Sequence, residues 1–191
     1  NYTLPTVSDN CLTGQAIQYI DINSLTASAF YPASSNGGQG FYFLAEHDGF
    51  VRDLSVEIGP TANSDVILEL FAGQVGCSNL LATKSGLNLT TGVNTINLTN
   101  GVTGSTAIVA GQFYHFRLTT ASGTLSVAFD TSNPLDGNKF GRSSYGDCQG
   151  EQANRMPVVE LNIAPLITPV LSGGLGSGAS FSVGTHTETY T

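Results

Sequence analysis

The chain has 191 residues and a net charge of -8, with 6 Lys+Arg against 14 Asp+Glu. Only 10% of its residues are charged, and the basic ones do not cluster. This argues against nucleic acid as a partner, because counterion release needs grouped lysines and arginines. No apolar run approaches the roughly 18 residues that span a bilayer, so we expect no membrane insertion.

The region from Phe41 to Ile163 alternates strand-like segments with turns rich in Gly, Asn, Asp and Ser. No window in it has a convincing helical period. Turn signals at short, regular intervals are typical of an antiparallel sandwich or jelly roll, so we predict an all-β fold. The predicted strands are in FYFLAEHDG, FVRDLSVEIG, DVILELFAG, NLLATKSGLNL, VNTINLTNGV, GQFYHFRLTT, SGTLSVAFDTS and MPVVELNIAP.

Two of these segments alternate clearly enough to predict which side chains share a face of the sheet. In FVRDLSVEIG, the first face carries Val51, Asp53, Ser55 and Glu57, and the second carries Arg52, Leu54, Val56 and Ile58. In GQFYHFRLTT, the first face carries Gln112, Tyr114, Phe116 and Leu118, and the second carries Phe113, His115 and Arg117.

Two polar segments interrupt the rhythm. YPASSNGGQG, before Phe41, is predicted to be a Gly/Ser loop. SNPLDGNKFGRSSYGDCQGEQANR is predicted to be a long loop, and loops of that length are often functional. It is our first candidate for ligand binding, and the alternative is a surface loop pinned by a disulfide. The candidate ligand contacts are Asn133, Asp136, Asn138, Arg142, Tyr145 and Arg155.

Three cysteines in a low-charge, Thr/Ser/Asn-rich chain suggest an exported protein in which disulfides persist. Cys77 lies in a predicted turn and Cys148 in the long polar loop. A bond between them would close a loop of about 70 residues and stabilise the fold by roughly 4 kcal/mol in the chain-entropy treatment. Cys11 would then be left over, which suggests a partner elsewhere.

We expect no enzymatic activity from this sequence. The histidines do not have zinc-ligand spacing, and no nucleophile-elbow motif occurs. An acid pair of the glycosidase type is the alternative, if acidic side chains on different strands converge on one face. Otherwise these acids lie on a solvated sheet face. The histidines are His47, His115 and His186, and the acids are Asp53, Glu57 and Glu69.

Calcium is the only cofactor that the sequence suggests. DTSNPLDGN concentrates oxygen ligands of the kind that calcium prefers, although it does not match EF-hand spacing. The candidate ligands are Asp130, Asn133 and Asp136.

Carbohydrate binding would use an aromatic platform beside polar groups. There is no Trp. Tyr31 and Tyr145 lie in polar contexts and are the candidates for stacking on a sugar.

The two ends of the chain resemble the two halves of one small module. NYTLPTVSDNC and ITPVLSGGLGSGASFSVGTHTETYT resemble the first and second halves of a hyalin repeat, an immunoglobulin-like module. The resemblance implies that Cys11 pairs with a Cys beyond Thr191. The chain starts at Asn1 instead of Met, so we expect a piece of a longer protein.

The segment between these halves resembles a jelly-roll domain of large secreted proteins of the Bacteroidetes type. The similarity lies in LFAGQ followed by CSNLLAT, in VAGQFYHFRLT and in the SNPL loop, where this chain departs from the family by reading DGN. We therefore predict a jelly-roll antiparallel β-sandwich inserted into a partial immunoglobulin-like β-sandwich. The predicted parts are residues 1–17, the insert 18–164, and residues 165–191.

The resemblance implies a non-enzymatic repeat module of a long adhesin or filament on the bacterial cell surface. Such proteins leave the cell by the type IX route, and some serve gliding motility. The expected partners are neighbouring repeats of the same polypeptide and surface glycans. The alternatives are a carbohydrate-binding module of a secreted polysaccharide-degrading enzyme, or a purely structural spacer.

Overall fold

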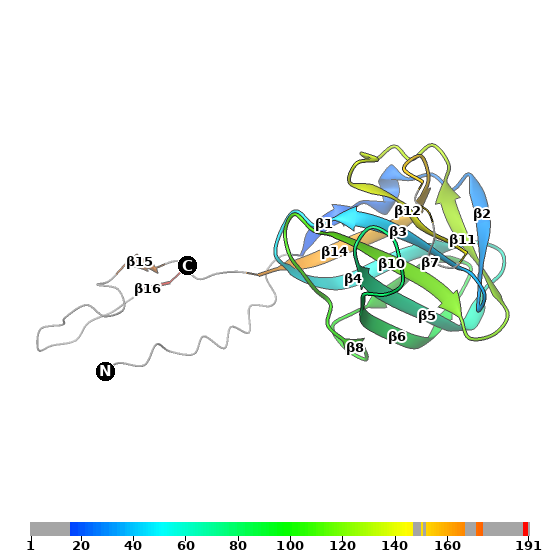
Figure 1. Ribbon diagram of the computed structural model, residues 1–191, viewed down its shortest axis with the longest axis horizontal. Coiled ribbons are helices and arrows are strands. Elements are labelled where there is room, and N and C mark those ends of the chain that lie inside the picture. Colours follow the sequence, from blue (N-terminus) through cyan, green and yellow to red (C-terminus); the bar gives the residue numbers. More distant parts are fainter. Residues whose placement is uncertain (1–15, 147–149, 151, 167–170, 174–188, 191) are drawn as a thin grey trace, which may run out of the picture.

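The computed structural model describes residues 16–146, 150, 152–166, 171–173 and 189–190. Two antiparallel sheets pack against each other as a β-sandwich (Figure 1). The only helical element of the described chain is one 3₁₀ turn, η1 (Ile22–Ser24), capped by the Asp21 side chain. The predicted all-β class and sandwich architecture are confirmed.

The first sheet has eight strands. In this sheet β14 lies between β1 and β4. On its other side, β4 pairs with β7 and β9. β11 pairs with β2, with β13 and with the last residue of β4. The strands are β1 (Ile17–Ile20), β2 (Ala29–Ser34), β4 (Gly49–Ile58), β7 (Gly92–Asn97), β9 (Ala107–Ile108), β11 (Thr124–Asp130), β13 (Met156–Pro157) and β14 (Val159–Pro165).

The second sheet has six strands in the order β12-β3-β10-β5-β6-β8. They are β12 (Phe140–Gly146), β3 (Gly38–Leu44), β10 (Phe113–Thr120), β5 (Asn63–Ala72), β6 (Leu80–Leu89) and β8 (Thr103–Gly104). A separate two-stranded sheet pairs β15 (Leu171–Gly173) with β16 (Thr189–Tyr190).

The core fills the space between the two large sheets. Alternate side chains of the strands point inward, and each fully buried Leu, Ile or Phe contributes about 1.5–3 kcal/mol. Aromatic rings concentrate where β3 and β10 pair, with Phe116 centred 5.4 Å from Phe41 and 6.1 Å from Phe43. Of the two predicted faces of β10, the one that carries Tyr114, Phe116 and Leu118 contributes these three buried side chains to the core.

The predicted faces of β4 are wrong at its beginning. Asp53 pairs with Asn162, but Val51 pairs with the next residue, Ile163, so Arg52 is the extra residue of a β-bulge. The bulge shifts the alternation by one position. Val51 is therefore buried and Arg52 exposed, the reverse of what strict alternation predicts.

The predicted Gly/Ser loop YPASSNGGQG is wrong, because it forms the end of β2, a tight turn and the start of β3. Ser34 and Gly37 exchange backbone hydrogen bonds across the turn. The glycines serve close packing in the strand. A Cβ atom at Gly40 would overlap the carbonyl oxygen of Phe116 on the neighbouring strand β10.

The predicted long polar loop is also interrupted by a strand. β12 lies in its middle and pairs with β3 along the edge of the second sheet. The segment lacks the apolar alternation of a typical strand, which is why the sequence did not indicate one.

The two ends of the sandwich are adjacent, since Ile17 of β1 pairs with Ile163 of β14. The sandwich strands thus run from Ile17 to Pro165. Most of residues 1–17 and 165–191 lies outside the described residues, so the domain boundaries stay a prediction. No helix in the described part of the chain is long and apolar enough to cross a membrane.

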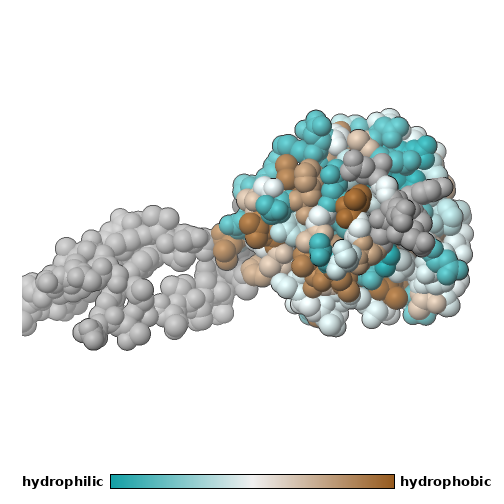
Figure 2. Space-filling model, viewed as in Figure 1, coloured by the Kyte–Doolittle hydropathy of each residue, from teal (hydrophilic) through white to brown (hydrophobic). Residues whose placement is uncertain are grey.

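The surface is polar at one end of the sandwich. The segments around β12, yellow in Figure 1, lie at the top of that view, where the surface in Figure 2 is largely hydrophilic. Apolar side chains show more strongly lower on this face (Figure 2). The large hydrophobic residues that are exposed over the whole described surface are Phe30, Phe50, Val75, Leu80, Val93, Val109 and Leu166.

Candidate functional site

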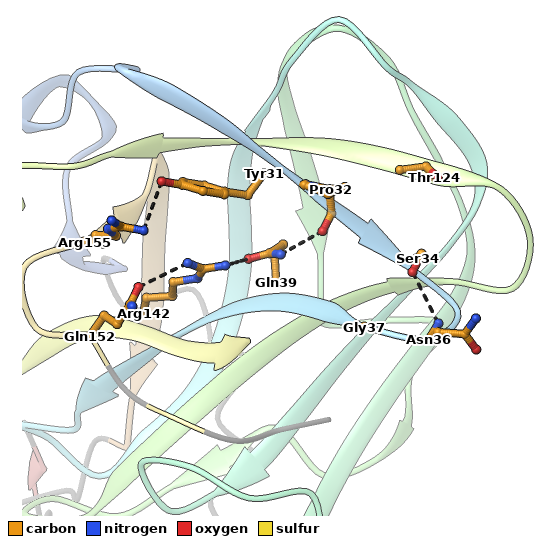
Figure 3. Close-up of a pocket in the computed structure, with 10 residues that line it drawn as sticks. All are labelled: Tyr31, Pro32, Ser34, Asn36, Gly37, Gln39, Thr124, Arg142, Gln152 and Arg155. Carbon is orange, nitrogen blue, oxygen red and sulfur yellow. Dashed lines mark hydrogen bonds between the residues drawn. The ribbon is translucent and has the colours of Figure 1, made fainter. Parts of the chain in front are cut away.

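A groove of about 790 Å³ opens between β2 of the first sheet and β3 and β12 of the second (Figure 3). This volume falls within the roughly 300–1,000 Å³ that is typical of ligand sites. The groove is lined by Tyr31, Pro32, Ser34, Asn36, Gly37, Gln39, Thr124, Arg142, Gln152 and Arg155.

Arg142 is the buried charged residue of the groove. It is only 1% exposed, and its guanidinium donates to Gln39 Oε1 at 2.6 Å and to Gln152 Oε1 at 3.1 Å. The same group lies 4.7 Å from the ring centre of Tyr31 and 5.0 Å from that of Phe129. These contacts fix Arg142 and, through it, the two glutamine side chains.

Arg155 is held over the groove by both its backbone and its side chain. The Arg142 backbone N–H donates to the carbonyl oxygens of Arg155, at 2.8 Å, and Gln152, at 3.1 Å. The Arg155 guanidinium donates to the Tyr31 hydroxyl at 3.0 Å and lies 5.5 Å from its ring centre (Figure 3). The Arg155 residue is partly exposed and forms no ion pair with another described residue.

The lining is rich in hydrogen-bonding groups. Among the described lining residues there are two guanidiniums, three side-chain amides and three hydroxyls, but no carboxylate. Such a surface binds polar ligands with many oxygen atoms. It is also locally basic in a chain of net charge -8.

The structure brings together two of the six predicted ligand residues, Arg142 and Arg155. Asn133 instead has a structural role: it is 8% exposed and donates to the carbonyl oxygens of Phe140 and Ala153. The exposed Asp136 accepts a hydrogen bond from the backbone of Asn138 at 3.0 Å, in a local turn.

Tyr145 belongs to β12, but its side chain is not among those described. Tyr31, predicted as a stacking residue, does line the groove.

Sequence reasoning missed the two glutamines of the groove. Gln39 lies in the segment that was predicted to be a loop, so no alternation indicated that its side chain is buried. Gln152 lies in the polar stretch after β12, and its contact with Arg142 depends on an isolated β-bridge between the two residues. Neither position carries a local signal that a sequence motif could supply.

The predicted calcium ligands have other partners. Asp130 accepts hydrogen bonds from the Thr26 and Ser132 backbones and from the Ser132 hydroxyl. Burial opposes ionisation of Asp130, but these hydrogen bonds outweigh it and lower its pKa. Among the described residues no group of three or more His, Cys, Asp or Glu is placed to hold a metal ion. Calcium binding stays a prediction.

The acidic residues on strands do not converge. Asp53 and Glu57 lie on β4 of the first sheet, whereas Glu69 lies on β5 of the second. Asp53 accepts from the Asn162 side chain, and Glu69 is paired with Arg117 at 2.7 Å. The alternative of a paired acid site on these three residues is therefore wrong.

The described histidines occupy contrasting places. His47 is exposed, whereas His115 is fully buried, with its ring stacked 4.9 Å from that of Phe71. Nδ1 of His115 lies 2.8 Å from the Gly73 carbonyl oxygen. Burial lowers the His115 pKa, because the charged form loses its hydration. His186 lies outside the described residues.

Cys77 lies in the turn after β5, where its sulfur accepts a hydrogen bond from Arg117 at 3.0 Å. The sulfur takes part in a disulfide. Both other cysteines, Cys11 and Cys148, lie outside the described residues, so the Cys77–Cys148 pairing stays a prediction.

Comparison with known proteins does not assign this chain. No protein-family model matches it. No curated protein matches it either. The resemblances to a hyalin repeat and to a secreted jelly-roll domain therefore stay predictions.

Proposed function

We propose that this chain is a non-enzymatic module of a long bacterial cell-surface adhesin, and that its sandwich attaches to surface glycans. The observation that carries the proposal is the groove between β2 and β12, whose lining combines guanidiniums, amides and hydroxyls. Sugars are recognised by such groups, because each hydroxyl of a sugar can donate and accept hydrogen bonds.

The position of the sandwich ends supports the adhesin part of the proposal. Because β1 and β14 are neighbouring strands, the first and last residues of the sandwich lie together. A domain with adjacent ends can be inserted into a surface loop of a host module at little cost. Many copies along one fibre would turn weak binding by each groove into firm attachment.

The test is a glycan array probed with the purified chain, beside the variant Arg155→Gln and the control Arg52→Gln. Both substitutions remove one positive charge, but Arg52 lies on β4 outside the groove. We expect the native chain and the Arg52 variant to bind the same glycans, and the Arg155 variant to lose them. An array on which the native chain binds nothing contradicts attachment and favours a structural spacer.

A further inference from the structure

We propose that the groove selects acidic saccharides, with the carboxylate of a uronic-acid type sugar bound by Arg155. This inference rests on the proposed function, because it names the class of glycan that the same groove binds.

The groove carries positive charge that would attract an acidic ligand. The chain contains only 6 Lys+Arg, and two of them line this one groove, where no described lining residue is acidic. Elsewhere in the described chain Arg52, Arg117 and Lys139 each have an acidic partner, and Lys84 donates to two backbone carbonyl oxygens. Arg155 has no such partner among the described residues. Its guanidinium is therefore the group that an incoming anion would meet.

The aromatic ring of the groove, Tyr31, already has contacts within the protein. A neutral sugar is commonly bound by stacking its apolar face on an aromatic ring. The Tyr31 ring is instead in contact with the guanidiniums of Arg142 and Arg155 and with the ring of Phe129, 5.1 Å away. Because these groups already contact its ring, Tyr31 positions the two arginines and does not serve as a stacking surface for a sugar. Recognition then depends on hydrogen bonds and charge.

Arg155 is held in place before any ligand binds. The backbone bond from Arg142 holds the turn that carries Arg155, and the Tyr31 hydroxyl holds its guanidinium. A guanidinium that is fixed before binding loses little conformational entropy when a ligand arrives. Its planar fork matches the two oxygens of a carboxylate, which a single hydroxyl cannot offer.

The rest of the groove has room for the body of the sugar. Figure 3 shows Arg155 at one end and Ser34, Asn36 and Thr124 towards the other. Their amide and hydroxyl groups suit sugar hydroxyls. An oligosaccharide bound along the groove would place its carboxylate at Arg155 and neutral units beyond it.

The experiment measures binding of the full chain by isothermal titration to three probes of matched length. The probes are an oligogalacturonide, the same oligosaccharide with its carboxylates reduced to alcohols, and a sulfated oligosaccharide. We expect the oligogalacturonide to bind and its reduced form to bind about 10- to 100-fold more weakly, as for loss of a hydrogen bond to a charged group. Affinity should also fall as ionic strength rises from about 0.01 M to about 0.1 M.

Three variants test which residue is responsible for binding the carboxylate. Arg155→Gln should lower affinity for the oligogalacturonide about 10- to 100-fold, to that of the reduced probe. Tyr31→Phe keeps the ring but removes the hydroxyl that positions Arg155, so it should weaken binding less. Arg52→Gln should leave binding unchanged. An unchanged thermal midpoint for each variant confirms that it is folded.

The outcomes separate this inference from the proposed function. Equal binding of the acidic and reduced probes overturns selection for acid but leaves glycan attachment standing. Binding of the sulfated probe alone, or an Arg155→Gln variant that binds normally, overturns the carboxylate contact. Failure of all three probes overturns the inference, whereas glycan attachment fails only if the array is also negative.

Discussion

The buried guanidinium of Arg142 gives the sharpest stability prediction. Replacing it by Met keeps an unbranched apolar stem but removes the guanidinium that donates to Gln39 and Gln152. Gln39 is only 5% exposed, so its carbonyl oxygen would stay buried without this donor. We therefore expect Arg142→Met to be among the most destabilising single substitutions in the sandwich.

The magnitude follows from the contacts. Two hydrogen bonds to a charged group contribute about 1.5–3 kcal/mol each, and the contacts with Tyr31 and Phe129 add to them. Part of this gain offsets the cost of burying the charge. Breaking such a buried arrangement from one side costs about 3–5 kcal/mol, so we expect a loss of about 3–4 kcal/mol. At roughly 2–4 °C per kcal/mol for a chain of this size, the thermal midpoint should fall by roughly 6–16 °C.

Urea unfolding measures this loss. The chain has no Trp and 7 Tyr, so tyrosine fluorescence and far-ultraviolet circular dichroism are the probes. Arg142→Lys keeps the charge without the fork and should lie between the native chain and Arg142→Met. The exposed Arg52 provides the control, and Arg52→Met should change stability by no more than about 0.5 kcal/mol. A loss below about 1 kcal/mol for Arg142→Met would refute the structural role assigned to this residue.

Three further predictions concern other parts of the sandwich. Gly40→Ala should cost more than about 3 kcal/mol in urea unfolding, because its Cβ would overlap a carbonyl oxygen of β10, and normal stability would contradict the observed strand spacing. The pKa of His115 is lowered in the folded chain, so the unfolded chain binds more protons at this residue. The contribution of neutral His115 to the free energy of unfolding is therefore complete above about pH 6.5 and is lost as the pH falls below that value. His115→Gln should flatten this part of the pH–stability curve. Non-reducing peptide mass spectrometry should find Cys77 linked to Cys148, and a Cys77–Cys11 peptide would refute that pairing.

The all-β fold was predictable because its signals are local. Apolar alternation in β10 and the turn before β5 each occupy only a few neighbouring residues, so the strands could be located one by one. The errors lie where a distant contact overrides local preference. The bulge at Arg52 follows from the register of β4 against β14, which no residue within β4 encodes.

The candidate site was only half predictable for the same reason. Arg142 and Arg155 stood out because charges are rare in this sequence. Gln39 and Tyr31 come from a segment more than a hundred residues earlier, and they meet Arg142 because the turn between β2 and β3 carries the chain from the first sheet to the second. The glycines that signal a loop in the sequence are what allow β3 to pack closely against β10.

Where the groove lies bears on how the module would work. The sandwich ends belong to β1 and β14, whereas the groove is built on β2, β3 and β12 and the turn that carries Arg155. Figure 1 shows β14 ending on the left of the sandwich and β2 on its right. Attachment to a host module through these ends would thus leave the groove facing outward. A spacer has no need of such a separation, whereas a domain that binds glycans from a fibre does.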